Sequence, residues 1–190
     1  MRKRLLLSAT AGAALLVVSG CAVTTDRAAE DPVARRRRID AGVDAALTKL
    51  YAQVPRSREL VAKASGALVF PEVISAGFVV GGSYGEGALR TGSRTAGYYK
   101  MVSAAVGLLA GAQSRAVYVL FMTRDALDRF AASNGWTAGV DASVAAATVG
   151  ANGELDIMAL QAPVIGFVLT NAGLMANLSL EGTKFIRIDL

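Results

Sequence analysis

Glycine recurs through residues 77–92, where the sequence reads GFVVGGSYGEGALRTG. Glycines this dense either wrap a phosphate group or lie in strands whose backbones approach each other closely. A dinucleotide-binding loop needs a helix directly after it, and a P-loop needs Gly-Lys-Ser/Thr. Neither pattern is present, because the glycine spacing differs and no helix is predicted after Arg90. The stretch therefore predicts a pair of curved, closely packed strands with bulges.

The rest of the chain predicts an α+β fold. Two N-terminal helices are followed by strands, by one internal helix over residues 124–133 that ends at Asn134-Gly135, and by further strands. This order favours an antiparallel β-sandwich or a partly closed barrel. The predicted strands are residues 67–70 (closed by Pro71), 78–80, 96–102, 116–123, 139–150, 164–170, 174–180 and 184–189.

Residues 39–54 have the spacing of an amphipathic helix of about four turns. Pro55 ends it, and Ser57 offers a capping hydroxyl for a second helix over residues 57–65. An amphipathic helix packs on a core or lies on a membrane, and the sequence leaves both open. The apolar positions of this predicted helix are Ile39, Val43, Ala46, Leu47, Leu50 and Val54.

The N-terminus has the layout of an export signal. Basic residues 2–4 precede an apolar run over residues 5–18, and Val-Ser-Gly then leads to Cys21, which is the one cysteine of the chain. This resembles a bacterial lipobox, so residues 1–20 are predicted to be a lipoprotein signal peptide and Cys21 to carry acyl chains. Because Ala22 rather than aspartate follows, the sorting rule of Gram-negative lipoproteins predicts the periplasmic face of the outer membrane. Residues 21–38 are predicted to be a flexible basic tether.

Four consecutive arginines close the predicted tether. Arg35, Arg36, Arg37 and Arg38 are candidate contacts for anionic lipid headgroups, at about 1 kcal/mol per residue at low salt. The alternative is a solvated start of the following helix. Removing the three basic residues of the signal segment lowers the formal net charge from +5 to +2, so nucleic acid is not an expected partner.

The chain has no histidine and a single cysteine. This composition argues against zinc, copper and haem sites and excludes Ser-His-Asp and Cys-His catalysis. Asp125 and Asp128 could share a helix face, but Arg124 and Arg129 flank them, which favours exposed ion pairs. We therefore expect no catalytic residues, no metal and no cofactor; an enzyme using carboxylates alone is the least favoured class.

The order of several motifs resembles the SYLF domain, a lipid-binding module found in actin regulators and in bacterial lipoproteins. The resemblance covers residues 39–190 and implies a β-rich domain with a basic, amphipathic N-terminal helix that engages phospholipid headgroups. Eukaryotic members bind phosphoinositides and in some cases actin, ligands that a bacterial envelope lacks. Two positions depart from the family pattern: Arg115 stands near an expected acidic residue, and Tyr98-Tyr99 replace a tryptophan. The matching segments are residues 63–71, 77–87, 107–113, 117–122, 137–146 and 173–182.

Two functions follow as expectations. The first is an outer-membrane-anchored periplasmic lipoprotein with a SYLF-like phospholipid-binding domain, whose partners are membrane phospholipids. The alternative is a structural or protein-interaction lipoprotein of the envelope, with residues 89–94 and 152–156 as contact loops for a protein partner. The sequence names neither the ligand nor the partner.

Overall fold

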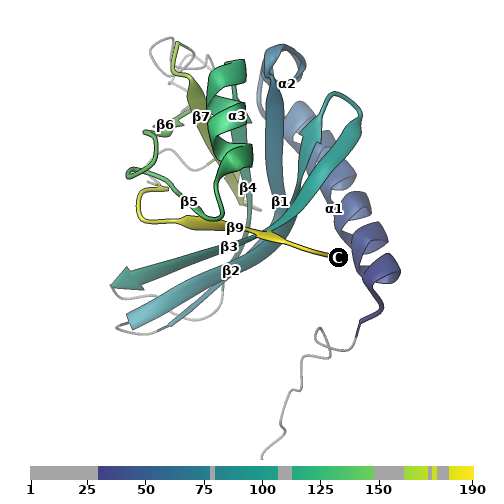
Figure 1. The fold of residues 1–190 in the computed structure, drawn as a ribbon, viewed down its shortest axis with the longest axis vertical. Helices are drawn as coiled ribbons and strands as arrows, with labels where there is room; N and C mark the ends of the chain where they lie inside the picture. The colour runs from purple at the N-terminus through teal and green to yellow at the C-terminus, as the bar shows by residue number, and fades with distance from the viewer. Residues whose placement is uncertain (1–29, 78–79, 107–112, 148–160, 171–172, 175–179) are drawn as a thin grey trace, which may run out of the picture. The chain divides into compact units, whose positions relative to one another are not determined.

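A curled sheet and three helices make up the part of the chain that the structure describes (Figure 1). This computed structural model describes residues 30–77, 80–106, 113–147, 161–170, 173–174 and 180–190. Residues 31–190 form one unit. The sheet curls into a half-barrel, which confirms the predicted α+β class and the partly closed barrel.

The chain begins with two helices, α1 (Pro32–Gln53) and α2 (Ser57–Lys63), and α3 (Arg124–Ala132) follows the fourth strand. The strands are β1 (Gly66–Gly77), β2 (Val80–Thr91), β3 (Arg94–Val106), β4 (Gln113–Phe121), β5 (Trp136–Thr137), β6 (Ala145–Ala146), β7 (Val164–Thr170), β8 (Gly173–Leu174) and β9 (Lys184–Ile188).

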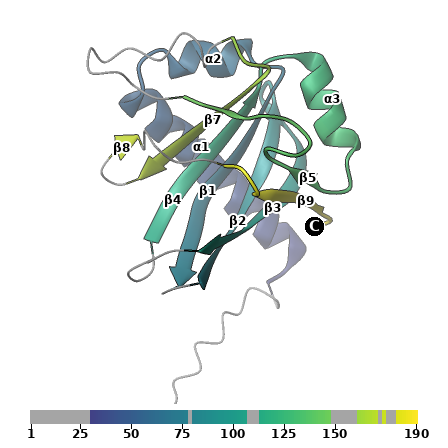
Figure 2. The same ribbon diagram turned by 90° about the vertical axis from the view of Figure 1, so that its left-hand side faces the viewer.

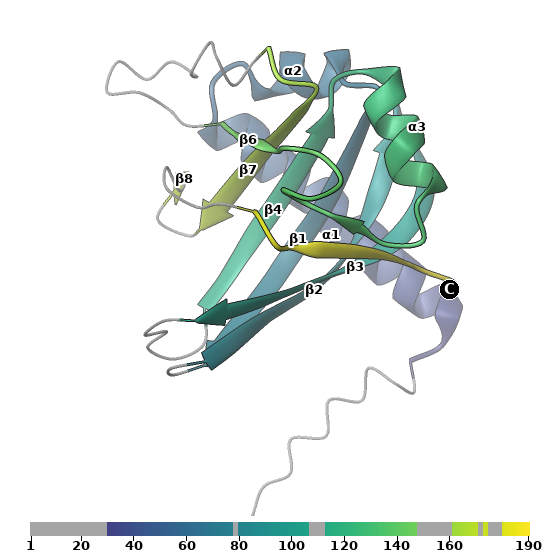
Figure 3. The same ribbon diagram turned by 60° about the vertical axis from the view of Figure 1, so that its left-hand side comes forward.

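The strands follow the order β5-β9-β3-β2-β1-β4-β7-β6, and β8 pairs with β7. Every pairing is antiparallel except the short one between β6 and β7. Helix α1 lies against one side of the sheet, which we call the outer face, and α3 lies on the other, the inner face (Figures 2 and 3). The sheet is therefore covered on both sides.

Each face of the sheet has its own apolar core. On β4 the side chains alternate, with Val117, Val119 and Phe121 in the inner core and Tyr118 and Leu120 in the outer core. The inner core also holds aromatic residues from α3, β5 and β9: Phe130, Trp136 and Phe185. The outer core is the contact between the sheet and α1.

The apolar side chains of α1 face the sheet and form part of the outer core. Ile39, Val43, Leu50 and Val54 are each at most 1% exposed, and they pack on the sheet together with Ala46. All six apolar positions of the predicted helix therefore pack on the sheet, with Leu47 partly buried. A membrane-facing role for these side chains is wrong, because the sheet already covers them.

The prediction that Pro71 closes the first strand is also wrong. Strand β1 continues through Pro71, because a bulge between Val69 and Glu72 shifts its register against β2. Glycines of β2 lie against this bulge. A Cβ on Gly87 would come within 2.1 Å of the Val69 carbonyl oxygen, and one on Gly85 within 2.8 Å of the Glu72 carbonyl oxygen. The glycine-rich stretch therefore serves close strand packing, as predicted.

Two other predicted elements differ from the structure. The hydroxyl of Ser57 does not cap α2; it donates to the carbonyl oxygens of Leu50 and Val54 and ties α2 to the end of α1. In residues 139–150, predicted as one strand, the described part contains a turn and then only β6. Small residues there favour neither state strongly, and the hydrogen bonds of residues 137–142 close a local turn instead.

Candidate functional site

The arginine run lies within a helix. Asp31 caps α1 by accepting a hydrogen bond from the Ala34 amide at 3.0 Å, and Pro32 occupies the first turn. The four arginines therefore occupy the first two turns of α1, and the predicted flexible tether is wrong from Pro32 onward. Residues 21–29 of that tether, Cys21 among them, lie outside the described residues.

Two of the four arginines are bound to one buried carboxylate. Arg35 donates to both oxygens of Glu86 on β2, at 2.7 and 3.3 Å, and Arg38 donates to it at 3.0 Å. The hydroxyl of Tyr84 adds a further hydrogen bond at 2.7 Å. Burial raises the pKa of Glu86, but these donors outweigh it and lower the pKa to about 2. Arg35 and Arg38 therefore fasten α1 to the outer face of β2.

The remaining two arginines are exposed at the surface. Arg36 donates a hydrogen bond to the main-chain carbonyl of Leu190, and Arg37 follows it on the helix. Arg36 also lines a cavity of about 310 Å³ beside β3 and β9, together with the exposed Arg187. We call Arg36 and Arg37 the basic surface.

A second polar network holds α1 against β2 and β3. The carboxylate of Asp40 accepts hydrogen bonds from the hydroxyls of Thr95 and Tyr98, each at 2.8 Å. Arg90 on β2 contacts Asp44 at 2.8 Å and Asp40 at 3.4 Å. None of the residues in this network was predicted from the sequence to hold the helix on the sheet. A signal was present, because Asp40 and Asp44 are spaced four residues apart on α1.

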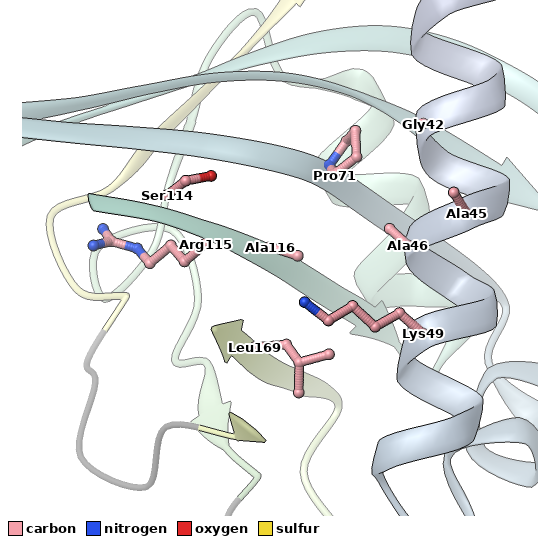
Figure 4. A pocket seen from close by; sticks show the side chains of 9 residues that line it. All are labelled: Gly42, Ala45, Ala46, Lys49, Pro71, Ser114, Arg115, Ala116 and Leu169. Atoms are coloured by element: carbon pink, nitrogen blue, oxygen red, sulfur yellow. The ribbon is translucent and has the colours of Figure 1, made fainter. Parts of the chain in front are cut away.

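A second cavity lies between α1 and β4, where β7 no longer pairs with β4 (Figure 4). Its volume is about 300 Å³, and most of its lining is apolar, including Ala46, Pro71 and Leu169. Lys49 extends from α1 toward β4, whereas the guanidinium of Arg115 points away from Lys49 (Figure 4). The cavity does not bring its two cations together, so this arrangement alone does not make an anion site.

Helix α3 carries ordinary surface ion pairs. Arg124 pairs with Asp128 at 3.3 Å, and Arg129 pairs with Asp125; all four side chains are at least 64% exposed. This confirms the ion-pair interpretation of the carboxylates. Within the described ranges, no cluster of three or more histidine, cysteine or acidic residues could hold a metal ion. None of the helices in those ranges combines the length and apolar character needed to cross a bilayer.

The C-terminal part of the chain matches a known protein family. Residues 102–189, which run from the end of β3 through β9, match the family Ysc84, described as Las17-binding protein actin regulator. This confirms the SYLF resemblance for that part of the chain. No curated protein matches the chain.

The basic surface lies outside the residues that match the family model. Arg36 and Arg37 come from α1, which precedes the matched residues. The predicted contact loop at residues 152–156 lies outside the described residues, and residues 89–94 form the end of β2, a turn and the first residue of β3. Of the predicted site residues, Arg35 and Arg38 form ion pairs with Glu86 inside the domain, whereas the side chains of Arg36 and Arg37 are exposed.

Proposed function

We propose that this protein is an outer-membrane-anchored lipoprotein of the periplasm whose Ysc84 domain binds anionic phospholipid headgroups through the basic surface. The family match supports a lipid-binding type of domain. The sequence around Cys21 supports the acyl anchor, and the partners are then the phospholipids of the anchoring membrane. We propose no catalytic role for any residue.

The observation that carries the proposal is that two of the four arginines of α1 form ion pairs within the domain, whereas the other two are exposed. Glu86 binds Arg35 and Arg38, while Arg36 and Arg37 stay exposed on the first turns of α1, fewer than twenty residues after Cys21. Because the apolar face of α1 is buried on the sheet, binding is electrostatic and needs no helix insertion. Guanidinium groups suit this role, since their planar donors pair with phosphate oxygens.

Co-sedimentation of the whole chain with vesicles tests this role. We expect binding to vesicles that contain phosphatidylglycerol, weaker binding to neutral phosphatidylcholine vesicles, and a loss of binding as salt rises. The variant Arg36→Gln/Arg37→Gln loses about 2 kcal/mol, or roughly 30-fold in affinity at low salt. The control Arg94→Gln/Arg124→Gln removes the same charge from two other exposed arginines and should bind like the wild type.

Two outcomes would contradict the proposal. Equal binding of both double variants would show that net charge, and not the basic surface, attracts the membrane. No binding to either vesicle type would favour the alternative role as a structural or protein-interaction lipoprotein. The anchor is tested separately by mass spectrometry of the native protein: a mass increase on a peptide that begins with Cys21 supports it, and a free thiol refutes it.

A further inference from the structure

A row of polar side chains crosses the inner face of the sheet below the inner core. Residues directly opposite each other in antiparallel strands share a face and lie side by side. Gln113 on β4 is opposite Ser75 on β1, Ser75 is opposite Ser83 on β2, and Ser83 is opposite Ser103 on β3. Four adjacent strands therefore present one continuous polar row.

The neighbouring row fixes which way these side chains point. There, Arg115 on β4 is opposite Val73 on β1, and Gly85 on β2 is opposite Met101 on β3. Val73 and Met101 are fully buried in the inner core. Since side chains two residues apart on a strand share a face, Ser75, Ser103 and Arg115 also face inward.

Arg115 reaches from β4 across β1 to the hydroxyls of the polar row. One terminal nitrogen of its guanidinium donates to Ser83 Oγ at 3.1 Å, and Ser83 Oγ lies 2.8 Å from Ser75 Oγ. The two serines are only 7% and 2% exposed. The three side chains thus form a connected and largely buried polar cluster.

The cluster contains a positive charge that no carboxylate of the described residues balances. Arg115 Nε is buried and has no hydrogen-bond acceptor in the described part of the chain, and no carboxylate of that part pairs with the guanidinium. Burial lowers the pKa of Arg115. By contrast, Arg35 and Arg90 each contact a carboxylate. Even partial desolvation of a cation is costly unless an anion accompanies it.

We propose that Arg115, together with Ser75, Ser83 and Ser103, forms a binding site for a phosphate-type oxyanion. The guanidinium supplies charge and directional N–H donors, and the hydroxyls arrive from three neighbouring strands. A tetrahedral oxyanion has enough acceptor oxygens to use donors from several directions. The site lies on the inner face, whereas Arg36 and Arg37 belong to the helix on the outer face, so it is independent of the proposed headgroup contact.

The phosphate group could be free in solution or carried by a lipid, and two arms of one experiment separate these sources. In the first arm, inorganic phosphate is titrated into the whole chain by isothermal calorimetry, with sodium chloride at matched ionic strength as the blank. In the second arm, the whole chain carrying Arg36→Gln/Arg37→Gln is sedimented with vesicles that contain phosphatidate, so that the basic surface does not contribute to binding. Saturable binding in the first arm identifies a soluble phosphate; binding in the second arm alone identifies a lipid phosphate.

Four variants make the test specific. Arg115→Gln should abolish binding in the positive arm, Arg115→Lys should retain part of it, and Ser103→Ala should weaken it about 10-fold. The control Arg94→Gln should leave binding unchanged. Circular dichroism and unfolding curves establish that each variant is folded, and Ser103→Ala removes the hydroxyl of a partly exposed residue that makes no side-chain hydrogen bond within the described residues.

Three results would overturn the proposal. They are no saturable binding in either arm, equal binding by wild type and Arg115→Gln, and an equal loss in Arg94→Gln. The variant Arg36→Gln/Arg37→Gln separates this site from the proposed function, because it should lose phosphatidylglycerol binding while its titration with inorganic phosphate stays unchanged.

Discussion

Replacing Glu86 with glutamine tests whether ion pairs hold α1 on the sheet. The carboxylate is 6% exposed and receives hydrogen bonds from Arg35, Arg38 and Tyr84. Glutamine keeps the size of the side chain but removes the negative charge. Glu86→Gln therefore leaves two cations around a neutral amide, and we expect the variant to be less stable at neutral pH.

The lowered pKa of Glu86 gives the size of the stability loss expected in Glu86→Gln. Its pKa is about 2 in the folded chain, against an ordinary value of 4.5. At about 1.4 kcal/mol per pH unit, the charged form contributes at most about 3.5 kcal/mol at pH 7. Solvent screening reduces this value, because the Arg38 side chain is 43% exposed. We expect Glu86→Gln to lower the free energy of unfolding by about 2 kcal/mol at pH 7, which lowers Tm by roughly 4–8 °C.

The sign of the pH dependence follows from the lowered pKa. The contribution of Glu86 is fully present above pH 4.5 and is lost as pH falls toward 2. The stability difference between wild type and Glu86→Gln should therefore shrink by more than half between pH 7 and pH 3. Urea unfolding measures it at each pH, with the fluorescence of the single, buried Trp136 as the probe.

One result would refute this reasoning. If Glu86→Gln loses the same free energy of unfolding at pH 3 as at pH 7, the carboxylate acts through packing and not through its charge. Arg124→Gln is the matched control, because it breaks an ion pair whose side chains are 80% and 64% exposed. We expect it to change stability by less than about 0.5 kcal/mol at any pH.

Two further predictions concern packing. Gly87→Ala should destabilise the fold by about 3 kcal/mol in urea unfolding, because the new Cβ would lie 2.1 Å from the Val69 carbonyl oxygen, whereas Gly82→Ala, with 3.4 Å to the Ser103 carbonyl oxygen, should cost less than about 1 kcal/mol. Equal losses in the two variants would contradict the close approach at the bulge. Tyr118→Phe should cost about 1 kcal/mol in the same assay, because the buried hydroxyl donates to the Ala46 carbonyl at 2.8 Å and holds α1 on β4. An unchanged unfolding midpoint would show that this hydrogen bond contributes no net stability.

Local patterns in the sequence predict much of the fold. The apolar spacing of residues 39–54 gives the buried face of α1, and residues 164–170 were predicted as the strand that is observed as β7. Both segments carry strong signals, since one has a helical period and the other is a continuous apolar run between turn residues. Helix α3 was predicted to within one residue for a similar reason.

The errors arise where tertiary contacts override a local rule. Pro71 normally ends a strand, but the bulge in β1 places it where the register against β2 is already interrupted. In residues 139–150, alanine, valine and glycine recur without a clear period, and the described part holds a turn over residues 139–141 and the two-residue β6. Such segments take their structure from the elements that surround them.

The site is less predictable than the fold. The sequence identifies the arginine run but not its partner, because Glu86 lies about fifty residues further along the chain. One signal was available: Glu86 is the single acidic residue in the glycine-rich stretch, and an isolated charge in a strand usually has a partner. Arg115 stood out only as a departure from the family pattern, and its contact with Ser83 required the register of three strands.

The position of the Glu86 ion pairs has a mechanical consequence. Any tension applied through the residues before Asp31 enters the domain at the first turn of α1, where Arg35 grips β2. A force on this end of the chain therefore acts on the ion pairs of Glu86 first, and only afterwards on the apolar contacts that Val43 and Leu50 make further along the helix. If the domain were pulled at this end, α1 would begin to separate from β2 at these ion pairs. The force needed would fall in acid, because Glu86 then loses its negative charge.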